Sequence, residues 1–98
     1  MVENLIKAHD IDAIAHFAAK IVVPDSVADP LGYYQSNTSK ARTLIDTAVK
    51  SGLKRFIFSS TAAVYGEPDE MPVSEMTRPQ PVSPYGRSKL MVEWMLED

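Results

Sequence analysis

The sequence contains no cysteine, and this absence excludes three kinds of chemistry. A disulfide scaffold, a thiolate zinc site and a cysteine nucleophile all require that side chain. Glycine is scarce too, since the only glycines are Gly32, Gly52, Gly66 and Gly86. None of them is spaced as G-x-G-x-x-G or G-x-x-x-x-G-K, so neither glycine-rich phosphate-binding motif is present.

Clustered positive charge and long hydrophobic runs are also missing. The 10 Lys and Arg residues are scattered among 13 Asp and Glu residues, and the formal net charge is −3. A nucleic-acid-binding face normally concentrates basic side chains, so we expect no nucleic-acid partner. No apolar run approaches the ~18 residues of a membrane span. Met-Val-Glu-Asn is not the basic start of a signal peptide, so we expect no membrane association and a cytoplasmic location.

What is present has the composition of a folded domain. Of the 98 residues, 45% are hydrophobic and 23% are charged. These proportions are typical of a soluble globular chain and argue against disorder. A chain of this length forms one domain at most. Segments with helical and strand spacing alternate along the sequence, which indicates an α/β arrangement.

The first half of the chain predicts a helix, a strand and a connection. Helical spacing covers 2–9, with Val2, Leu5 and Ile6 on one face. The apolar run over 11–19 is too short to favour a buried helix and predicts a buried parallel strand. Residues 20–29 contain a proline and are interpreted as a loop or a partly helical connection.

A long helix follows, from Asp29-Pro30 to Lys50. Aspartate caps helices and proline suits their first position, while Gly52 supplies the stop. A second buried strand over 56–58 then completes a strand–helix–strand unit, which is right-handed almost without exception. The predicted apolar face of the helix comprises Leu31, Tyr34, Thr38, Ala41, Leu44, Ile45, Ala48 and Val49.

The last part of the sequence predicts a loop and a helix. Five of the seven prolines fall within 66–84, which indicates an ordered or semi-ordered loop that we expect to cover a site. Ser83-Pro84 repeats the cap-and-proline start, and a helix is predicted over 85–97. Trp94 and the neighbouring methionines are interpreted as core or interface residues.

Three polar side chains indicate a chemical site. Thr61 follows the second strand, and ligands bind at the carboxyl ends of strands in open α/β sheets. Tyr85 and Lys89 are four residues apart and so share one face of the last helix. A free phenol has a pKa near 10, but a nearby ammonium favours the phenolate. Such a phenolate can remove the proton of a sugar or alcohol hydroxyl as hydride leaves carbon.

Simpler interpretations remain open for each residue taken alone. Tyr85 and Lys89 also suit an amphipathic surface pair, and Thr61 suits a hydroxyl that merely ends a strand. His9 and His16 lack surrounding carboxylates, so no metal site is expected and His16 is interpreted as a packed core residue. The acidic residues of the proline-rich segment are interpreted as solubilising it, and they are Glu67, Asp69, Glu70 and Glu75.

The combined order of these segments resembles the extended short-chain dehydrogenase/reductase family, and within it the UDP-hexose 4-epimerases. The resemblance is carried by His16-Phe17-Ala18-Ala19, by 29–34 with Asn37, by 55–66 and by 83–90. It implies part of a Rossmann-type doubly wound parallel sheet, with two strands and their flanking helices. The chain would then be the central to C-terminal part of an NAD-binding domain. The first βαβ half and the C-terminal substrate lobe would be lacking.

The resemblance also implies site residues. Tyr85 would be the catalytic base, Lys89 its partner and a ligand of the nicotinamide ribose, and Thr61 the active-site hydroxyl. Further contacts with NAD would come from Phe17, Ala18, Ala19, Lys20, Asn37 and Ser59. Where the family often has Asn-Asn, this chain has Ser36-Asn37, and Lys20 falls one place earlier than the family's lysine.

Ala62 and Ala63 help to choose among the relatives. Sugar-nucleotide dehydratases of this family need acidic residues directly after the active-site hydroxyl to eliminate water, and alanine cannot transfer a proton. The resemblance therefore implies an NAD-dependent 4-epimerase that interconverts UDP-glucose and UDP-galactose as a homo-oligomer. Two alternatives stay open: another NAD-dependent sugar-nucleotide epimerase or reductase, and a non-catalytic, self-associating fragment. The isolated chain itself is expected to be inactive.

Overall fold

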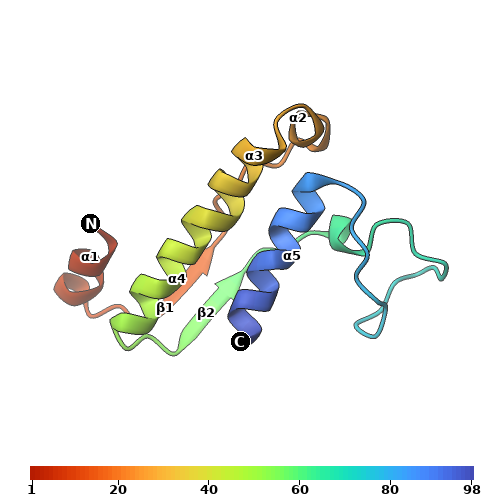
Figure 1. Ribbon diagram of the computed structural model, residues 1–98. Coiled ribbons are helices and arrows are strands. Elements are labelled where there is room, and N and C mark those ends of the chain that lie inside the picture. Colours follow the sequence, from red (N-terminus) through yellow and green to blue (C-terminus); the bar gives the residue numbers. More distant parts are fainter.

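Two short parallel strands form a sheet, and helices cover one of its faces (Figure 1). The computed structural model describes residues 1–98. In chain order the elements are α1 (Val2–His9), β1 (Ala13–His16), α2 (Val23–Ala28), α3 (Pro30–Tyr33), the π-helical η1 (Tyr34–Ser39), α4 (Lys40–Lys50), β2 (Arg55–Phe58), the 3-10 helix η2 (Ala62–Tyr65) and α5 (Pro84–Glu97). The predicted α/β class is therefore confirmed.

The strands pair in parallel, with Ala13 opposite Arg55 and His16 opposite Phe58. One more ladder bond follows, in which the Ser59 N–H donates to the His16 carbonyl at 3.1 Å. Because both strands run in the same direction, Phe17 and Ser59 leave the sheet at the same edge. This edge is the carboxyl edge of the sheet.

β1 is shorter than the strand predicted over 11–19. It ends at His16, and the chain then turns into an irregular stretch before α2. The backbone groups of Lys20 and Val22 bind side chains of the long helix instead of a neighbouring strand. Those side-chain partners satisfy the backbone groups that a strand ladder would otherwise take.

The expectation of fully buried strands is also wrong for this chain. Burial alternates along both strands, because helices pack on one sheet face only. His16, Phe56 and Phe58 are half-buried on the covered face, whereas the Ile57 side chain on the other face is 61% exposed. The fold is thus two layers thick, with extents of 47 × 31 × 18 Å.

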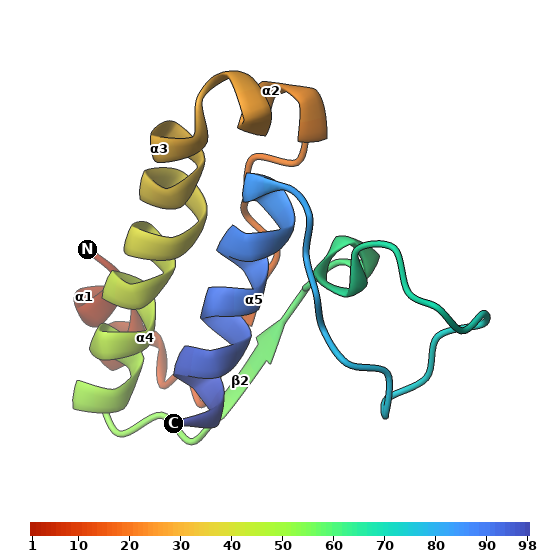
Figure 2. The same cartoon turned by 45° about the vertical axis from the view of Figure 1, so that its right-hand side comes forward.

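α3, η1 and α4 form one continuous helix from Pro30 to Lys50, as the cap and stop signals predict. The Asp29 carboxylate accepts a hydrogen bond from the Gly32 N–H at 3.1 Å, and Gly52 adopts a φ of 79° after the last turn. The helix lies beside α5, and both pack over the sheet (Figure 2).

The π segment changes which face of this helix is buried. A π turn contains more residues than an α turn, so side chains ahead of it move out of the 3.6-residue spacing. Tyr33 and Asn37 are buried in place of the predicted Tyr34 and Thr38, while Leu31 is 78% exposed. After the π segment the prediction holds for Ala41 and Ala48, which are buried, and for Leu44 and Ile45, which are half-buried. It is wrong for Val49, which is 68% exposed.

The proline-rich segment has no regular element between Tyr65 and Pro84. It closes where Gly66, at a φ of 62°, faces the backbone of Gln80. Its middle extends away from the helices rather than over the first turn of α5 (Figure 2), so the expectation that it covers the site is wrong.

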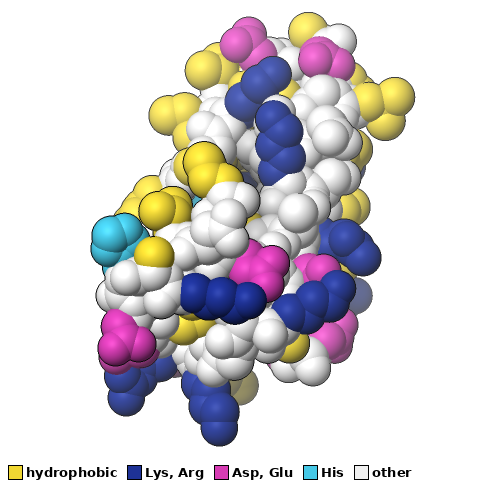
Figure 3. All heavy atoms as spheres, turned by 90° about the vertical axis from the view of Figure 1, so that its left-hand side faces the viewer, with side chains coloured by type: hydrophobic (Ala, Val, Ile, Leu, Met, Phe, Trp, Pro, Cys, Tyr) yellow, Lys and Arg dark blue, Asp and Glu magenta, His cyan; other side chains and the backbone are white.

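The exposed surface carries charges of both signs. On the side of α1 and α4, Lys, Arg, Asp and Glu side chains are intermixed (Figure 3). Two ion pairs each join residues within a single helix. Lys7 pairs with Glu3 in α1 and Lys50 pairs with Asp46 in α4, both at 2.9 Å. None of the helices has both the length and the apolar character that crossing a membrane would require.

Candidate active site

Thr61 lies where the chain leaves β2 and begins η2. Its backbone is extended, and its side-chain oxygen accepts a hydrogen bond from the Ala63 N–H at 3.2 Å. The hydroxyl therefore caps η2 while its own hydrogen stays available for donation. The sequence predicted the position of Thr61 at the carboxyl edge, and the capping contact explains why the hydroxyl is held there.

The first turn of α5 approaches η2 closely. Ser83 caps the helix by accepting from the Gly86 N–H at 3.1 Å. A Cβ atom at Gly86 would lie 2.6 Å from the Ala63 carbonyl oxygen, which is closer than side-chain atoms can approach. Glycine at this position thus allows the start of α5, with Tyr85, to lie against the segment that carries Thr61.

Tyr85 is only 8% exposed, so its interpretation as a surface residue is wrong. Its ring meets the ring of Tyr33 edge to face, with 6.5 Å between centroids and an interplanar angle of 89°. This arrangement suits two aromatic rings packed in a fixed orientation. Tyr33 is therefore a site neighbour that the sequence analysis missed.

Lys89 is 3% exposed, and its ammonium lies 4.5 Å from the centre of the Phe58 ring. Burial lowers the pKa of this ammonium from its ordinary value, and no carboxylate forms an ion pair with it. Its position above the end of β2 brings it over the carboxyl edge. A buried cation without an acidic partner is typical of functional sites.

His16 lies beside this cation on the covered sheet face. Its ring stacks on Phe58 with 5.9 Å between centroids. Burial, and then the charge of Lys89, lower the pKa of the imidazole. His16 is thus packed against a neighbouring ring, as predicted, but it is half-buried and does not belong to the core.

The predicted cofactor-lining residues after β1 lie at the same edge. Phe17 is 68% exposed and Ala18 is exposed, so both are open to a ligand. Ala19 and Lys20 line a cavity of about 530 Å³ together with Tyr33. The Lys20 ammonium lies 5.8 Å from the centre of the Tyr33 ring.

Asn37 is placed differently from these open residues. It is 2% exposed, and its amide nitrogen donates to the Lys20 carbonyl at 2.8 Å and to the Ser88 hydroxyl at 3.3 Å. Its amide oxygen accepts from the Lys20 N–H at 2.8 Å. Its contacts with the site therefore run through Lys20 and α5. The family resemblance had indicated Asn37, but nothing in the sequence indicated its bonds to Lys20 and Ser88.

Two further serines complete the edge. Ser59 continues the ladder from β2 by its backbone, and its side chain is half-buried. The Ser60 hydroxyl oxygen is buried without a hydrogen-bond partner. An unpaired polar atom at a strand end is unfavourable unless a ligand or a further group meets it.

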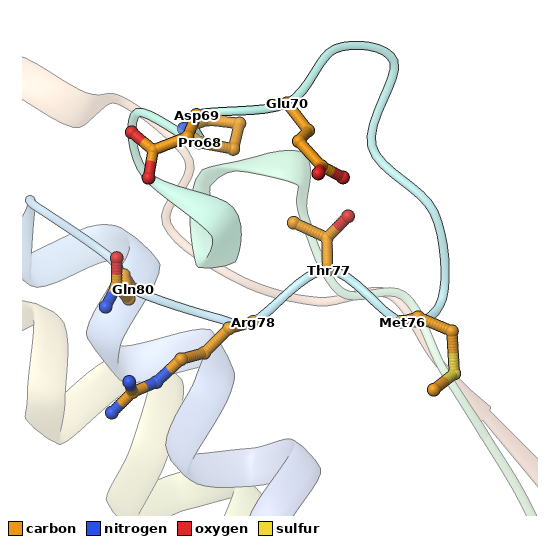
Figure 4. Close-up of a pocket in the computed structure, with 7 residues that line it drawn as sticks. All are labelled: Pro68, Asp69, Glu70, Met76, Thr77, Arg78 and Gln80. Atoms are coloured by element: carbon orange, nitrogen blue, oxygen red, sulfur yellow. The ribbon is translucent and has the colours of Figure 1, made fainter.

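A separate cavity of about 370 Å³ lies within the proline-rich segment (Figure 4). All seven lining residues come from that segment, and the Thr77 side chain points toward that of Glu70 (Figure 4). None of the predicted site residues contributes to it. It is therefore distinct from the carboxyl-edge site.

A parallel sheet with a Tyr-x-x-x-Lys helix above its carboxyl edge defines an α/β protein of the Rossmann class. The chain belongs to the NAD dependent epimerase/dehydratase family, which it matches over residues 1–98. The resemblance seen in the sequence is thereby confirmed.

Several relatives match almost the whole chain. It is 46% identical to a UDP-glucose 4-epimerase of Azospirillum brasilense over 98 residues, which are 28% of that protein. The UDP-Glc/GlcNAc 4-epimerase of Campylobacter jejuni superposes with a TM-score of 0.94 at 50% identity, covering 99% of this chain and 30% of that one. The UDP-glucose 4-epimerase of Bifidobacterium longum, in complex with NAD+ and UDP, gives a TM-score of 0.94 at 40% identity, covering 99% and 29%. The chain thus spans less than a third of the length of these relatives.

Proposed function

We propose that this chain forms the catalytic part of a UDP-hexose 4-epimerase that interconverts UDP-glucose and UDP-galactose. One observation carries the proposal: α5 holds Tyr85 and the buried Lys89 over the carboxyl edge where Thr61 lies. The 4-epimerases among its relatives support the choice of reaction. Ala62 and Ala63 argue against a dehydratase, since neither side chain can transfer a proton.

The residues present fit the nicotinamide ribose end of NAD. The Lys89 ammonium is a donor without an acidic partner, and the Ser60 hydroxyl is an unpaired polar atom at the same edge. We propose that Lys89 and Tyr85 hold the ribose and that Phe17, Ala18 and Ala19 line the ring. Lys20 and Ser59 would add polar contacts, and Asn37 would act through Lys20. When bound, NAD would supply the acceptor for the hydride of the sugar C4 and, once reduced, the donor that gives the hydride back.

The side chains of this chain supply the proton chemistry. The Tyr85 phenolic oxygen takes the proton of the C4 hydroxyl and later returns it. The Lys89 ammonium stabilises the phenolate through its positive charge. The Thr61 hydroxyl, which already accepts from the Ala63 N–H, donates its hydrogen to the sugar oxygen and orients it.

The test is a hybrid enzyme in which residues 1–98 replace the matching segment of the Azospirillum brasilense relative. We expect the hybrid to convert UDP-galactose to UDP-glucose while its NAD content stays constant. A folded hybrid that retains NAD but does not turn over would contradict the proposal. An activity on other sugar nucleotides, with none on these two, would support the alternative of a different epimerase or reductase.

A further inference from the structure

The stretch between β1 and α2, residues 17–22, forms no strand or helix of its own, although its last carbonyl, that of Val22, accepts a bond from the Ser26 N–H of α2 at 3.2 Å. We call it the 17–22 segment. Backbone N–H and C=O groups without partners destabilise a fold, so such a stretch needs ligands from elsewhere in the chain. Two side chains of the long helix supply them.

Each of these two side chains binds one residue of the 17–22 segment. It bonds with both the backbone N–H and the backbone C=O of that residue. The Tyr33 hydroxyl donates to the Val22 carbonyl at 2.7 Å and accepts from the Val22 N–H at 3.1 Å. The Asn37 amide makes the same pair of bonds with Lys20, both at 2.8 Å. The two bonds at each residue resemble the exchange between paired strands, with a side chain replacing one strand.

The same two side chains also contact α5. The Tyr33 ring meets the Tyr85 ring edge to face, and the Asn37 amide donates to the Ser88 hydroxyl at 3.3 Å. Ser88 in turn donates to the Tyr85 carbonyl at 2.7 Å. Tyr33 and Asn37 are 3% and 2% exposed, so water competes little for these bonds.

The π segment brings both residues to this position. Tyr33 and Asn37 are four residues apart, and the wider turn of η1 aligns them on the buried face. The neighbouring Thr38 hydroxyl donates to the Ser88 carbonyl at 3.0 Å, which adds a second bond between the helices. Regular α-helical spacing would place Tyr34 on that face instead.

We propose that Tyr33 and Asn37 are positioning residues that tie the 17–22 segment to the first turns of α5. One connection runs from Val22 through Tyr33 to Tyr85, and the other from Lys20 through Asn37 to Ser88. The segment that lines the cofactor and the helix that carries the base are thereby held in one fixed relation. The assignment of cofactor and base rests on the proposed function, whereas the connection itself does not.

The first test measures hydrogen exchange of the Val22 amide in the 98-residue chain. Tyr33→Phe keeps the ring against Tyr85 but removes both bonds to Val22, so protection of that amide falls by about tenfold. The matched control is Tyr34→Phe, since the Tyr34 hydroxyl makes no hydrogen bond, and it leaves the protection unchanged. Unchanged protection of Val22 in Tyr33→Phe overturns the proposal.

The second test uses the hybrid enzyme and separates positioning from simple loss of stability. Tyr33→Phe lowers kcat by about tenfold and leaves KM for the sugar nucleotide within about twofold. The reason is that the connection through Tyr33 positions the base and takes no part in sugar binding. Ser88→Ala cuts the other connection with little change in volume and lowers kcat in the same way, whereas Tyr34→Phe does not. Native kcat in both Tyr33→Phe and Ser88→Ala overturns the positioning role.

The two proposals fail in different ways. An unsubstituted hybrid that binds NAD but shows no turnover contradicts the proposed function. The connection between the 17–22 segment and α5 is then still tested by hydrogen exchange of the Val22 amide. Normal turnover together with unchanged Val22 exchange in Tyr33→Phe contradicts the tie and leaves the function standing.

Discussion

At the scale of single residues, the site concentrates groups that a stable core would not contain. Lys89 holds a positive charge at 3% exposure, where it contacts the Phe58 ring and has no acidic partner. A cation over an aromatic ring contributes about 0.5–2 kcal/mol. Burial lowers the pKa of Lys89, so its charged form is disfavoured in the folded state. The position is therefore costly for stability, which is expected where function selects the residue.

Tyr85→Phe tests the base directly. The substitution keeps the ring against Tyr33 and removes only the hydroxyl, so the fold and bound NAD should persist. General acid–base catalysis contributes about 10²–10⁴-fold, and we expect a loss of turnover of that size in the hybrid enzyme. Tyr65→Phe, a matched control in η2, should keep its turnover. Near-normal turnover of Tyr85→Phe would remove Tyr85 from the mechanism.

Lys89→Met should stabilise the fold in a pH-dependent way. The lowered pKa means that the folded state prefers the neutral amine, so stability from this group is present above about 10.5 and lost as pH falls through the folded-state pKa. At neutral pH the native chain carries this cost and the Met variant does not.

We therefore expect a higher urea midpoint for Lys89→Met at pH 7, with a difference that narrows as pH rises toward 10.5. Lys40→Met, at an exposed position, should show no such trend. A difference that stays constant with pH would contradict the desolvation of Lys89.

His16 reports on the same cation. Burial and then the Lys89 charge lower the pKa of its imidazole. Lys89→Met removes the second cause only, so the pKa of His16 should rise and still stay below 6.5. An NMR titration of the ring measures this, with Lys40→Met as control. No change in the titration of His16 would mean that the ammonium does not face the imidazole.

At the scale of elements, the two cap-and-proline starts behave alike. Asp29 and Ser83 each accept a hydrogen bond from the N–H of a glycine three residues later. The two glycines differ in what a Cβ would meet. At Gly32 it meets the mobile carboxylate of the cap, whereas at Gly86 it meets the Ala63 backbone.

Gly86→Ala should move α5 away from η2. Alanine favours a helix by about 1 kcal/mol over glycine, but overpacking against fixed backbone costs about 1–3 kcal/mol. We expect net destabilisation of up to about 2 kcal/mol in urea unfolding and at least about tenfold lower turnover, because Tyr85 shifts relative to Thr61.

Gly32→Ala is the matched control for that substitution. Its carboxylate neighbour can rotate away, so the expected cost is limited to a lost cap of about 0.5–2 kcal/mol. A stabilised, fully active Gly86→Ala variant would show that helix propensity decides at this position and that the close approach does not matter.

Sequence patterns predicted the elements that local signals define. The bounds of α1 and α5 and the ends of the long helix follow from caps, prolines and spacing, and the structure agrees with each to within a residue. The strand over 11–19 was predicted too long, because its end is set by distant partners, Tyr33 and Asn37. Spacing at 3.6 residues also could not anticipate the π segment, whose wider turn is stabilised by contacts with α5.

The same distinction between local signals and contacts of distant residues applies to the residues of the candidate site. Thr61, Tyr85 and Lys89 were found because order along the chain and a four-residue spacing are local signals. Tyr33, Ser88 and Gly86 were not, since their importance lies in contacts across the fold. The roles of all these residues stay predictions until the variants are measured.

At the scale of the whole molecule, the chain leaves much apolar surface open. Only 14 of 98 residues are buried, and one sheet face carries the 61% exposed Ile57 without any helix over it. Each strand has a neighbour on one side only. Unpaired strand edges and uncovered parallel sheets are templates for association.

We expect the 98-residue chain to self-associate and to bind NAD weakly. Most affinity for the pyrophosphate of a dinucleotide comes from a glycine-rich turn at a helix N-terminus, and this sequence has no such motif. Sedimentation over a range of concentrations measures association, and absorbance of the purified chain measures retained NAD. Ile57→Lys places a charge on the open sheet face and should shift the distribution toward monomer. Leu31→Lys, at a position 78% exposed on the helical layer, should not. A monodisperse monomer with one NAD per chain would contradict both parts of this prediction. Equal effects of Ile57→Lys and Leu31→Lys on association would show that the chain does not associate through the open face of the sheet.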